Sequence, residues 1–130
     1  IEGIAAELAC QKITEAEIGE IGRLLAEMID FHARKERAPY MQINQKIHQR
    51  TVEIAANPVL YTVWQSLVPR VERARALANL DTGRWTGALF EHTKMFTALA
   101  SRDGKLLAQL TREHFLNSLP FLQSRLENDG

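Results

Sequence analysis

Three histidines interrupt the apolar stripes of three separate helical segments, and they are the residues best suited to chemistry. His48, His92 and His114 each fall where a repeat of three and four residues would otherwise place an apolar side chain. Asn44 precedes His48 by one turn, about 40° away around a helix of ~3.6 residues per turn, so the two side chains can form a two-pronged clamp. The pattern predicts donor atoms that converge on one point inside a helical bundle.

A divalent metal ion would explain why these polar side chains occupy core positions. A buried neutral imidazole without a partner costs about 1–3 kcal/mol, and three such costs in one small core call for a common cause. Imidazole nitrogen suits zinc, nickel, iron or copper, and we favour zinc or nickel. We therefore expect a metal site made by Asn44, His48, His92 and His114, with coordination positions left open for water or a small anion.

The same histidines have a plainer interpretation as hydrogen-bonded residues of a core that binds no metal, and spacing alone does not decide between the two. His32 illustrates it, because it lies near a helix end where it can hydrogen-bond terminal carbonyls, and we leave it out of the site. Glu91 and Glu113 directly precede two of the site histidines. Because neighbouring helical positions point about 100° apart, we expect these carboxylates to be solvated or to act as outer partners of the ligands.

Composition and charge exclude several classes of protein. The chain has 130 residues with 16 basic and 16 acidic side chains, so nothing in its balance favours nucleic acid or anionic lipid. The single cysteine, Cys10, cannot form an internal disulfide, and we expect a reducing, cytoplasmic environment. The longest uncharged run, 54–69, is too short and too polar to span a bilayer, and no signal peptide is recognisable. Because the chain begins at Ile1 already in helical pattern, we expect it to be part of a longer protein.

Apolar residues recur at three- and four-residue steps almost throughout the chain, and no stretch alternates with a period of two. This pattern predicts an all-α fold. Short links between the segments favour an antiparallel bundle of about six helices in one domain that covers residues 1–130. Turns at 81–83 and 103–104 are expected to separate the last helices, and Pro69 and Pro120 are expected to bend the helices that contain them.

Helix boundaries follow from capping residues and prolines. Thr14 and Glu17 form a capping-box pattern that opens the second helix, and Asn57 is expected to cap the fourth. A helix is expected from about Pro39 to Ala56, because the residue before a proline disfavours helical geometry while proline itself suits the first turn.

Four segments carry the histidines and their neighbours in a characteristic order: Asn44-Gln45-Lys46-Ile47-His48, Ala56-Asn57-Pro58-Val59-Leu60, Glu91-His92, and Arg112-Glu113-His114-Phe115. In these segments the chain resembles the FCD domain, the FadR C-terminal effector-binding domain of GntR-type bacterial transcription regulators. The resemblance covers essentially all 130 residues. It implies that Asn44, His48, His92 and His114 bind a divalent metal on the floor of an effector cavity, and that the effector is a small carboxylate metabolite. It also implies a homodimer, and contact with DNA only through an amino-terminal winged helix-turn-helix domain that is absent from this chain.

The resemblance implies that further residues contact the effector. Many relatives have aspartate where this chain has Asn44, and a neutral amide oxygen leaves more positive charge on a bound cation. Such a cation with open positions favours an anionic oxygen ligand over water. Arg70, Arg73 and Arg75 are candidates for a second anchor of the carboxylate, or for a solvated basic face, and we take Arg73 as the anchor. Asn117 is expected to line the same cavity, or else to have a capping or surface role.

The leading functional hypothesis is a ligand-sensing and dimerising domain rather than an enzyme. An organic acid would bind at the metal and shift the helices, and the shift would be relayed to DNA-binding domains. One alternative is a small helical metalloenzyme, a hydrolase using metal-bound hydroxide, although the chain has no HExxH motif and no general base at helical spacing from the histidines. The other is a structural helical dimer whose histidines only fill the core.

Overall fold

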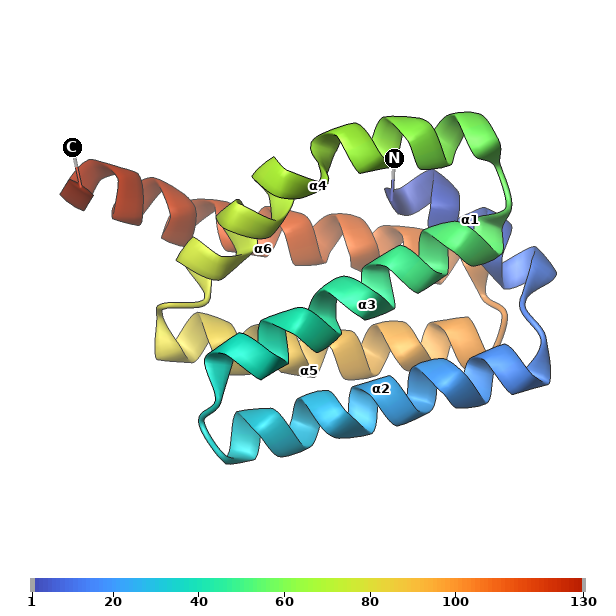
Figure 1. Cartoon of the computed structure of the whole chain (residues 1–130), viewed down its shortest axis with the longest axis horizontal. Helices are drawn as coiled ribbons and strands as arrows, with labels where there is room; N and C mark the ends of the chain where they lie inside the picture. The colour runs from blue at the N-terminus through green and yellow to red at the C-terminus, as the bar shows by residue number, and fades with distance from the viewer. Residues whose placement is uncertain (1, 130) are drawn as a thin grey trace.

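Six α-helices alternate in direction and pack side by side in a bundle (Figure 1). The computed structural model describes residues 2–129, and it describes side chains up to residue 123. In chain order the helices are α1 (Glu2–Lys12), α2 (Glu15–Ala33), α3 (Arg37–Ala55), α4 (Pro58–Ala78), α5 (Thr82–Ala100) and α6 (Gly104–Asp129). No strand occurs within residues 2–129, so the predicted all-α bundle of about six helices is confirmed.

Short polar side chains cap the starts of four of these helices, among them α2, α4 and α5. The Thr14 hydroxyl accepts the Glu17 N–H at 3.1 Å while the Glu17 carboxylate accepts the Thr14 N–H at 2.9 Å, so both halves of the predicted capping box form at the start of α2. Asn57 and Asp81 each accept the backbone N–H three residues on, at 3.1 and 2.8 Å, and so cap α4 and α5. These bonds satisfy amides that have no partner inside the helix.

The third helix begins two residues earlier than the sequence predicts. It starts at Arg37 rather than Pro39, and it ends at Ala55 because Ala56 adopts the left-handed conformation with a φ of 54°. The first N–H groups of a helix lack partners within it, so Pro39 in the first turn removes no hydrogen bond and the helix extends back past it. The N-cap, Glu36, makes no side-chain capping bond, so no capping pattern marks this start in the sequence.

The later turns are tighter than expected, since α5 begins at Thr82 and α6 at Gly104, immediately after Asp81 and Asp103. The Asp103 side chain accepts a backbone N–H of α6 at 3.1 Å, so Gly104 lies within the first turn instead of breaking the chain. Figure 1 shows α4 changing direction near its middle, in the region that contains Pro69.

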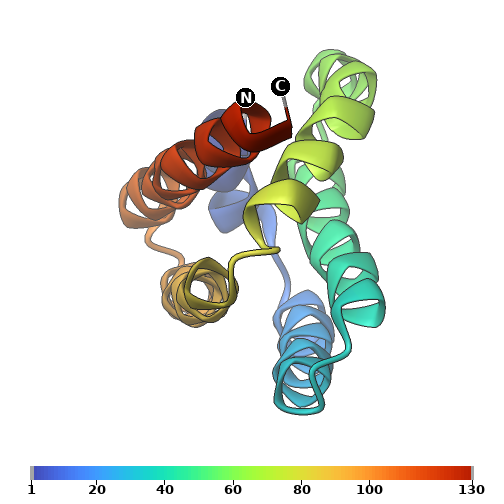
Figure 2. The same ribbon diagram turned by 90° about the vertical axis from the view of Figure 1, so that its left-hand side faces the viewer.

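The first helix lies between α3 and α6, as the view along the bundle shows (Figure 2). On the other side, α2 packs against α3 and α5, and the main core forms where these five helices meet. A smaller apolar cluster joins α1 and α3 to α4. It is centred on Trp64, whose side chain is buried.

The fourth helix is the least buried of the six. Of the apolar side chains of α4 only Trp64 and Ala78 are buried, and Val63 and Leu67 are exposed. It packs mainly against α3 and α6. Within residues 2–129, no helix combines the length and hydropathy that crossing a bilayer requires.

Candidate metal centre

Three helices each bring one histidine to the same buried place. His48 lies on α3, His92 on α5 and His114 on α6, and only 5%, 3% and 6% of these residues is exposed. One ligand atom from each ring lies within 4.8 Å of those of the other two. The ring centres of His92 and His114 are 4.6 Å apart, and those of His48 and His92 are 5.2 Å apart. Rings that the sequence distributes over separate apolar stripes are therefore neighbours in the folded chain.

Two of these rings carry nitrogen atoms without a partner. Nε2 of His48 and Nε2 of His92 are both buried, and neither makes a hydrogen bond within the described part of the chain. A buried polar atom left unpaired costs about 1–3 kcal/mol, which a core used only for packing would avoid. Nδ1 of His114 lies 2.6 Å from a Glu91 oxygen, which leaves the Nε2 of that ring available. The donor set therefore fits a divalent cation held by imidazole nitrogens.

All three rings are held in the neutral form, which is the form that binds a metal. Burial lowers the pKa of His48 and of His92 well below the usual value, and the charges of Arg75 and of the neighbouring histidines act in the same direction. Burial also lowers the pKa of His114, although the hydrogen bond to Glu91 opposes it. Because metal ligands must be deprotonated, binding near neutral pH does not have to displace protons from these rings.

Glu91 fixes the orientation of His114. Arg84 donates to both Glu91 oxygens, at 2.9 and 2.5 Å, and Asn117 donates to one of them at 3.0 Å. Burial by itself raises the pKa of Glu91, but the hydrogen bonds from Arg84, His114 and Asn117 outweigh it and hold the pKa well below the usual range. An ionised carboxylate beside Nδ1 favours the tautomer with its proton there and a lone pair on Nε2. Glu91 does not share the direction of His92; it reaches across to α6 instead.

Glu113 and His32 stay outside this cluster. Glu113 is exposed and accepts a hydrogen bond from Gln109 at 3.1 Å, so it belongs to the outer surface of α6. The His32 ring packs 4.6 Å from the Trp85 ring, and its Nε2 lies 3.1 Å from the Thr86 hydroxyl. His32 therefore bonds across to α5 rather than to the terminal carbonyls of its own helix.

Asn44 lies one turn before His48 on α3 and is 3% exposed. Its Nδ2 has no hydrogen-bond partner within the described residues. Rotation of the amide exchanges its nitrogen and oxygen, so the side chain can present either a donor or an acceptor from that place. Its role as a fourth ligand stays a prediction.

The arginines of α4 differ in their surroundings. Arg70 and Arg73 are exposed, whereas the Arg75 side chain is only 11% exposed and pairs with Glu2 and Glu72 at 2.8 and 3.0 Å. Arg73 does not line the described cavities beside the histidines, so its role as an effector anchor stays a prediction. Asn117, the other residue predicted to contact an effector, is exposed and bonds to Glu91 instead of lining these cavities.

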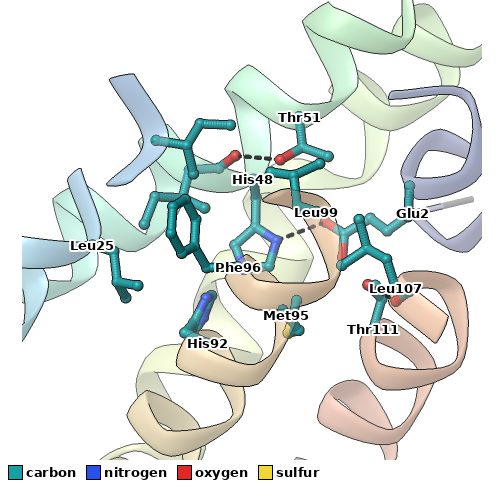
Figure 3. Close-up of a pocket in the computed structure, with 13 residues that line it drawn as sticks. Glu2, Leu25, His48, Thr51, His92, Met95, Phe96, Leu99, Leu107 and Thr111 are labelled. Carbon is teal, nitrogen blue, oxygen red and sulfur yellow. Dashed lines mark hydrogen bonds and ion pairs between the residues drawn. The ribbon is translucent and has the colours of Figure 1, made fainter. Parts of the chain in front are cut away.

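Two cavities of very different size meet at the site. The first, the histidine cavity, has a volume of about 40 Å³ and lies between His48, His92 and apolar side chains that include Leu25, Phe96 and Leu99 (Figure 3). The second, the outer groove, has a volume of about 860 Å³ and is lined mainly by residues of α1, α4 and α6. A groove of that size matches the usual volume of small-molecule sites, roughly 300–1,000 Å³.

Sequence reasoning missed two charged residues of the site, Arg84 and Glu2. Arg84 is buried and lies seven residues, or two turns, before Glu91 on α5, and that spacing is a signal that could have found it. Glu2 meets Arg75 across 73 positions of sequence, and no local pattern connects them.

The described chain is an all-helical bundle with a ligand-sized groove next to a cluster of three histidines, two of which carry an unpaired Nε2. The chain belongs to the FCD domain family, whose model matches residues 1–117, and this confirms the resemblance inferred from the four segments. This family is the C-terminal effector-binding domain of GntR/FadR-type regulators, so the chain is a regulatory sensor domain and not an enzyme. A search of curated proteins finds no match to the chain.

Proposed function

We propose that this domain senses a small carboxylate metabolite at a divalent cation held by His48, His92 and His114, with Asn44 as the fourth ligand. The observation that carries the proposal is the pair of buried, unpaired Nε2 atoms on His48 and His92 beside His114. Zinc or nickel suits these donors. When bound, the cation would supply a positive centre with open positions for an anionic oxygen.

Residues around the histidines orient one of the rings and line the cavity beside them. Glu91, held by Arg84, fixes the His114 ring, so the ring need not be ordered when a ligand arrives. Leu25 and Phe96 give the histidine cavity an apolar lining (Figure 3). A ligand therefore approaches from the outer groove, between α1, α4 and α6.

A sensor must have two arrangements to which its ligand binds with different affinity. In this domain α3, α5 and α6 carry the histidines, while α1 and α4 frame the outer groove. We place the change in α1 and α4, because their side chains would contact a ligand in the groove. The shift would reach a winged helix-turn-helix domain on the amino-terminal side, and through that domain DNA.

The proposal includes a homodimer of the domain. Exposed apolar side chains on α4, among them Val59, Val63 and Leu67, favour burial against another surface. Light scattering after gel filtration should give twice the mass of the chain, which is 14.7 kDa. A monomer at every concentration tested would contradict this part of the proposal.

The direct test is calorimetric titration of a panel of carboxylates into zinc-loaded and into metal-free protein. We expect at least one carboxylate to bind the zinc-loaded protein and none to bind the metal-free protein at the same concentrations. A chain that binds neither metal nor carboxylate up to millimolar concentrations would instead support a purely structural role for the histidines.

A further inference from the structure

The Glu2 carboxylate, in the first turn of α1, is held by donors from another helix. Arg75 Nη2 donates to both of its oxygens, at 3.0 and 2.8 Å, and Trp64 Nε1 donates to Oε1 at 3.3 Å. The same oxygen lies 3.6 Å from Nδ1 of His48, an approach drawn in Figure 3. One carboxylate therefore lies between the Arg75 guanidinium and the edge of a histidine ring.

Glu2 also lies on the boundary between the two cavities. Glu2 and Thr111 are the residues that line both the histidine cavity and the outer groove. The histidine cavity, at about 40 Å³, has room for a water molecule or two but not for an organic metabolite. The Glu2 side chain therefore lies on a path from the outer groove to the histidines.

The donors around Glu2 form a recognition site for any carboxylate. A guanidinium nitrogen and an indole N–H both donate charge-assisted hydrogen bonds to the oxygens of one carboxylate. Nη1 of Arg75 is occupied by Glu72 at 3.0 Å, whereas Nη2 bonds to Glu2. If Glu2 left, Nη2 would be a largely buried donor without its acceptor, and a second carboxylate would restore the lost bonds.

We propose that Arg75 and Trp64 form a carboxylate subsite, which Glu2 fills when no ligand is present and from which one end of a dicarboxylate ligand displaces it. The inference rests on the proposed function, in which the other end of the ligand binds at the cation. Nδ1 and Nε2 lie on different edges of the His48 ring, so one carboxylate group cannot reach the subsite and the cation together. The ligand class is therefore a short dicarboxylate, and its binding releases the first turn of α1.

The test compares succinate with acetate as calorimetric probes of the zinc-loaded protein. Arg75→Gln should weaken succinate binding by about tenfold or more, since a charged hydrogen bond is lost, and should change acetate binding less than about twofold. Glu2→Gln should strengthen succinate binding several-fold, because the neutral amide competes less well for Arg75. The matched controls are Arg23→Gln and Glu27→Gln, two exposed residues of α2 that line neither the histidine cavity nor the outer groove.

A spectroscopic measurement gives an independent result that does not depend on Arg75→Gln being folded. The indole N–H resonance of Trp64, assigned with a Trp85→Phe variant, should shift when succinate is added to the wild-type protein and much less when acetate is added. Zinc content and thermal unfolding of each variant show that the histidine site is intact.

The outcomes separate this inference from the function on which it rests. Succinate binding to zinc-loaded wild type that is unaffected by Glu2→Gln, with no shift of the Trp64 indole, overturns the subsite and leaves metal-dependent sensing in place. If zinc-loaded wild type binds neither succinate nor acetate nor any other carboxylate of the panel, the proposed function itself fails, and the subsite fails with it.

Discussion

Nε2 of His92 has no partner in the described residues, and this ring makes no carboxylate contact like that of His48 with Glu2 or of His114 with Glu91. Replacement by leucine keeps an apolar side chain of similar volume and removes one ligand. We expect His92→Leu to weaken zinc affinity by more than about 100-fold. Loss of a residue that only hydrogen-bonds a metal ligand typically weakens affinity about 10–100-fold, and His92 is proposed to be a ligand itself. Zinc content after dialysis, measured by mass spectrometry, checks this.

The matched control is His32→Leu, because His32 is also on a helix facing α5 but bonds to Thr86 and lies outside the cluster. It should retain one zinc per chain. Equal zinc content in the two variants would mean that the three clustered rings are not the binding site.

Glu91 and Glu113 offer a second matched pair, because each directly precedes a site histidine. Glu91→Gln removes the charge that fixes His114 Nδ1, and we expect zinc affinity to fall about 10–100-fold, as is typical when such a partner is lost. Glu113→Gln should change it little, since Glu113 bonds only to Gln109 among described residues. Competition with a chromophoric chelator measures both affinities, and comparable losses in the two variants would refute the orienting role.

The histidines could be predicted because a polar ring in an apolar stripe is visible locally. Their partners were harder to predict. Neighbouring positions on a helix point about 100° apart, as Glu91 and His92 do. This spacing does not predict which residue of another helix a side chain contacts. Glu2 and Arg75 illustrate the same limit, because their contact depends on how α1 crosses α4 and on no periodicity within either helix.

At the scale of elements, two glycines of α2 differ in what surrounds them. A Cβ at Gly19 would meet only the end of the Arg23 side chain at 3.6 Å, whereas one at Gly22 would lie 3.1 Å from the Phe96 ring of α5. Gly19→Ala should therefore stabilise the protein by about 0.5–1 kcal/mol through helix propensity. Gly22→Ala should stabilise it less or destabilise it, because the ring must shift. Urea unfolding measures both, and equal gains would show that α2 and α5 pack less closely than described.

Capping patterns predicted the helix starts correctly at Thr14 and Asn57, where a side chain makes the cap. They failed at Arg37, where the preceding Glu36 makes no capping bond and the proline acts inside the first turn rather than at its edge. The fourth segment was predicted to be helical, as it is, and part of its apolar surface, including Val59 and Val63, is exposed. Periodicity reports that a face is apolar, but the face can be covered by something outside the described chain.

For the molecule as a whole, the metal should add to the free energy of unfolding, because a cation that binds only the folded chain stabilises it by mass action. A free zinc concentration 100 times the dissociation constant corresponds to about 2.7 kcal/mol. We expect excess chelator to lower the melting temperature of the zinc-loaded protein by several degrees. Differential scanning calorimetry measures this melting temperature. His92→Leu should melt at the same temperature with and without chelator. Identical melting curves of the wild-type protein with and without chelator would indicate that no cation stabilises the fold.

The three rings come from positions 48, 92 and 114, on helices that only long-range packing brings together. Because a chain is synthesised from its amino terminus, a partly made domain has His48 and later His92 but no complete ligand set until α6 has emerged. If the proposed site holds an ion, newly made protein cannot bind it until the last helix has docked. Cells short of the metal would then accumulate finished chains that are less resistant to proteolysis, and the abundance of the domain would follow the metal supply.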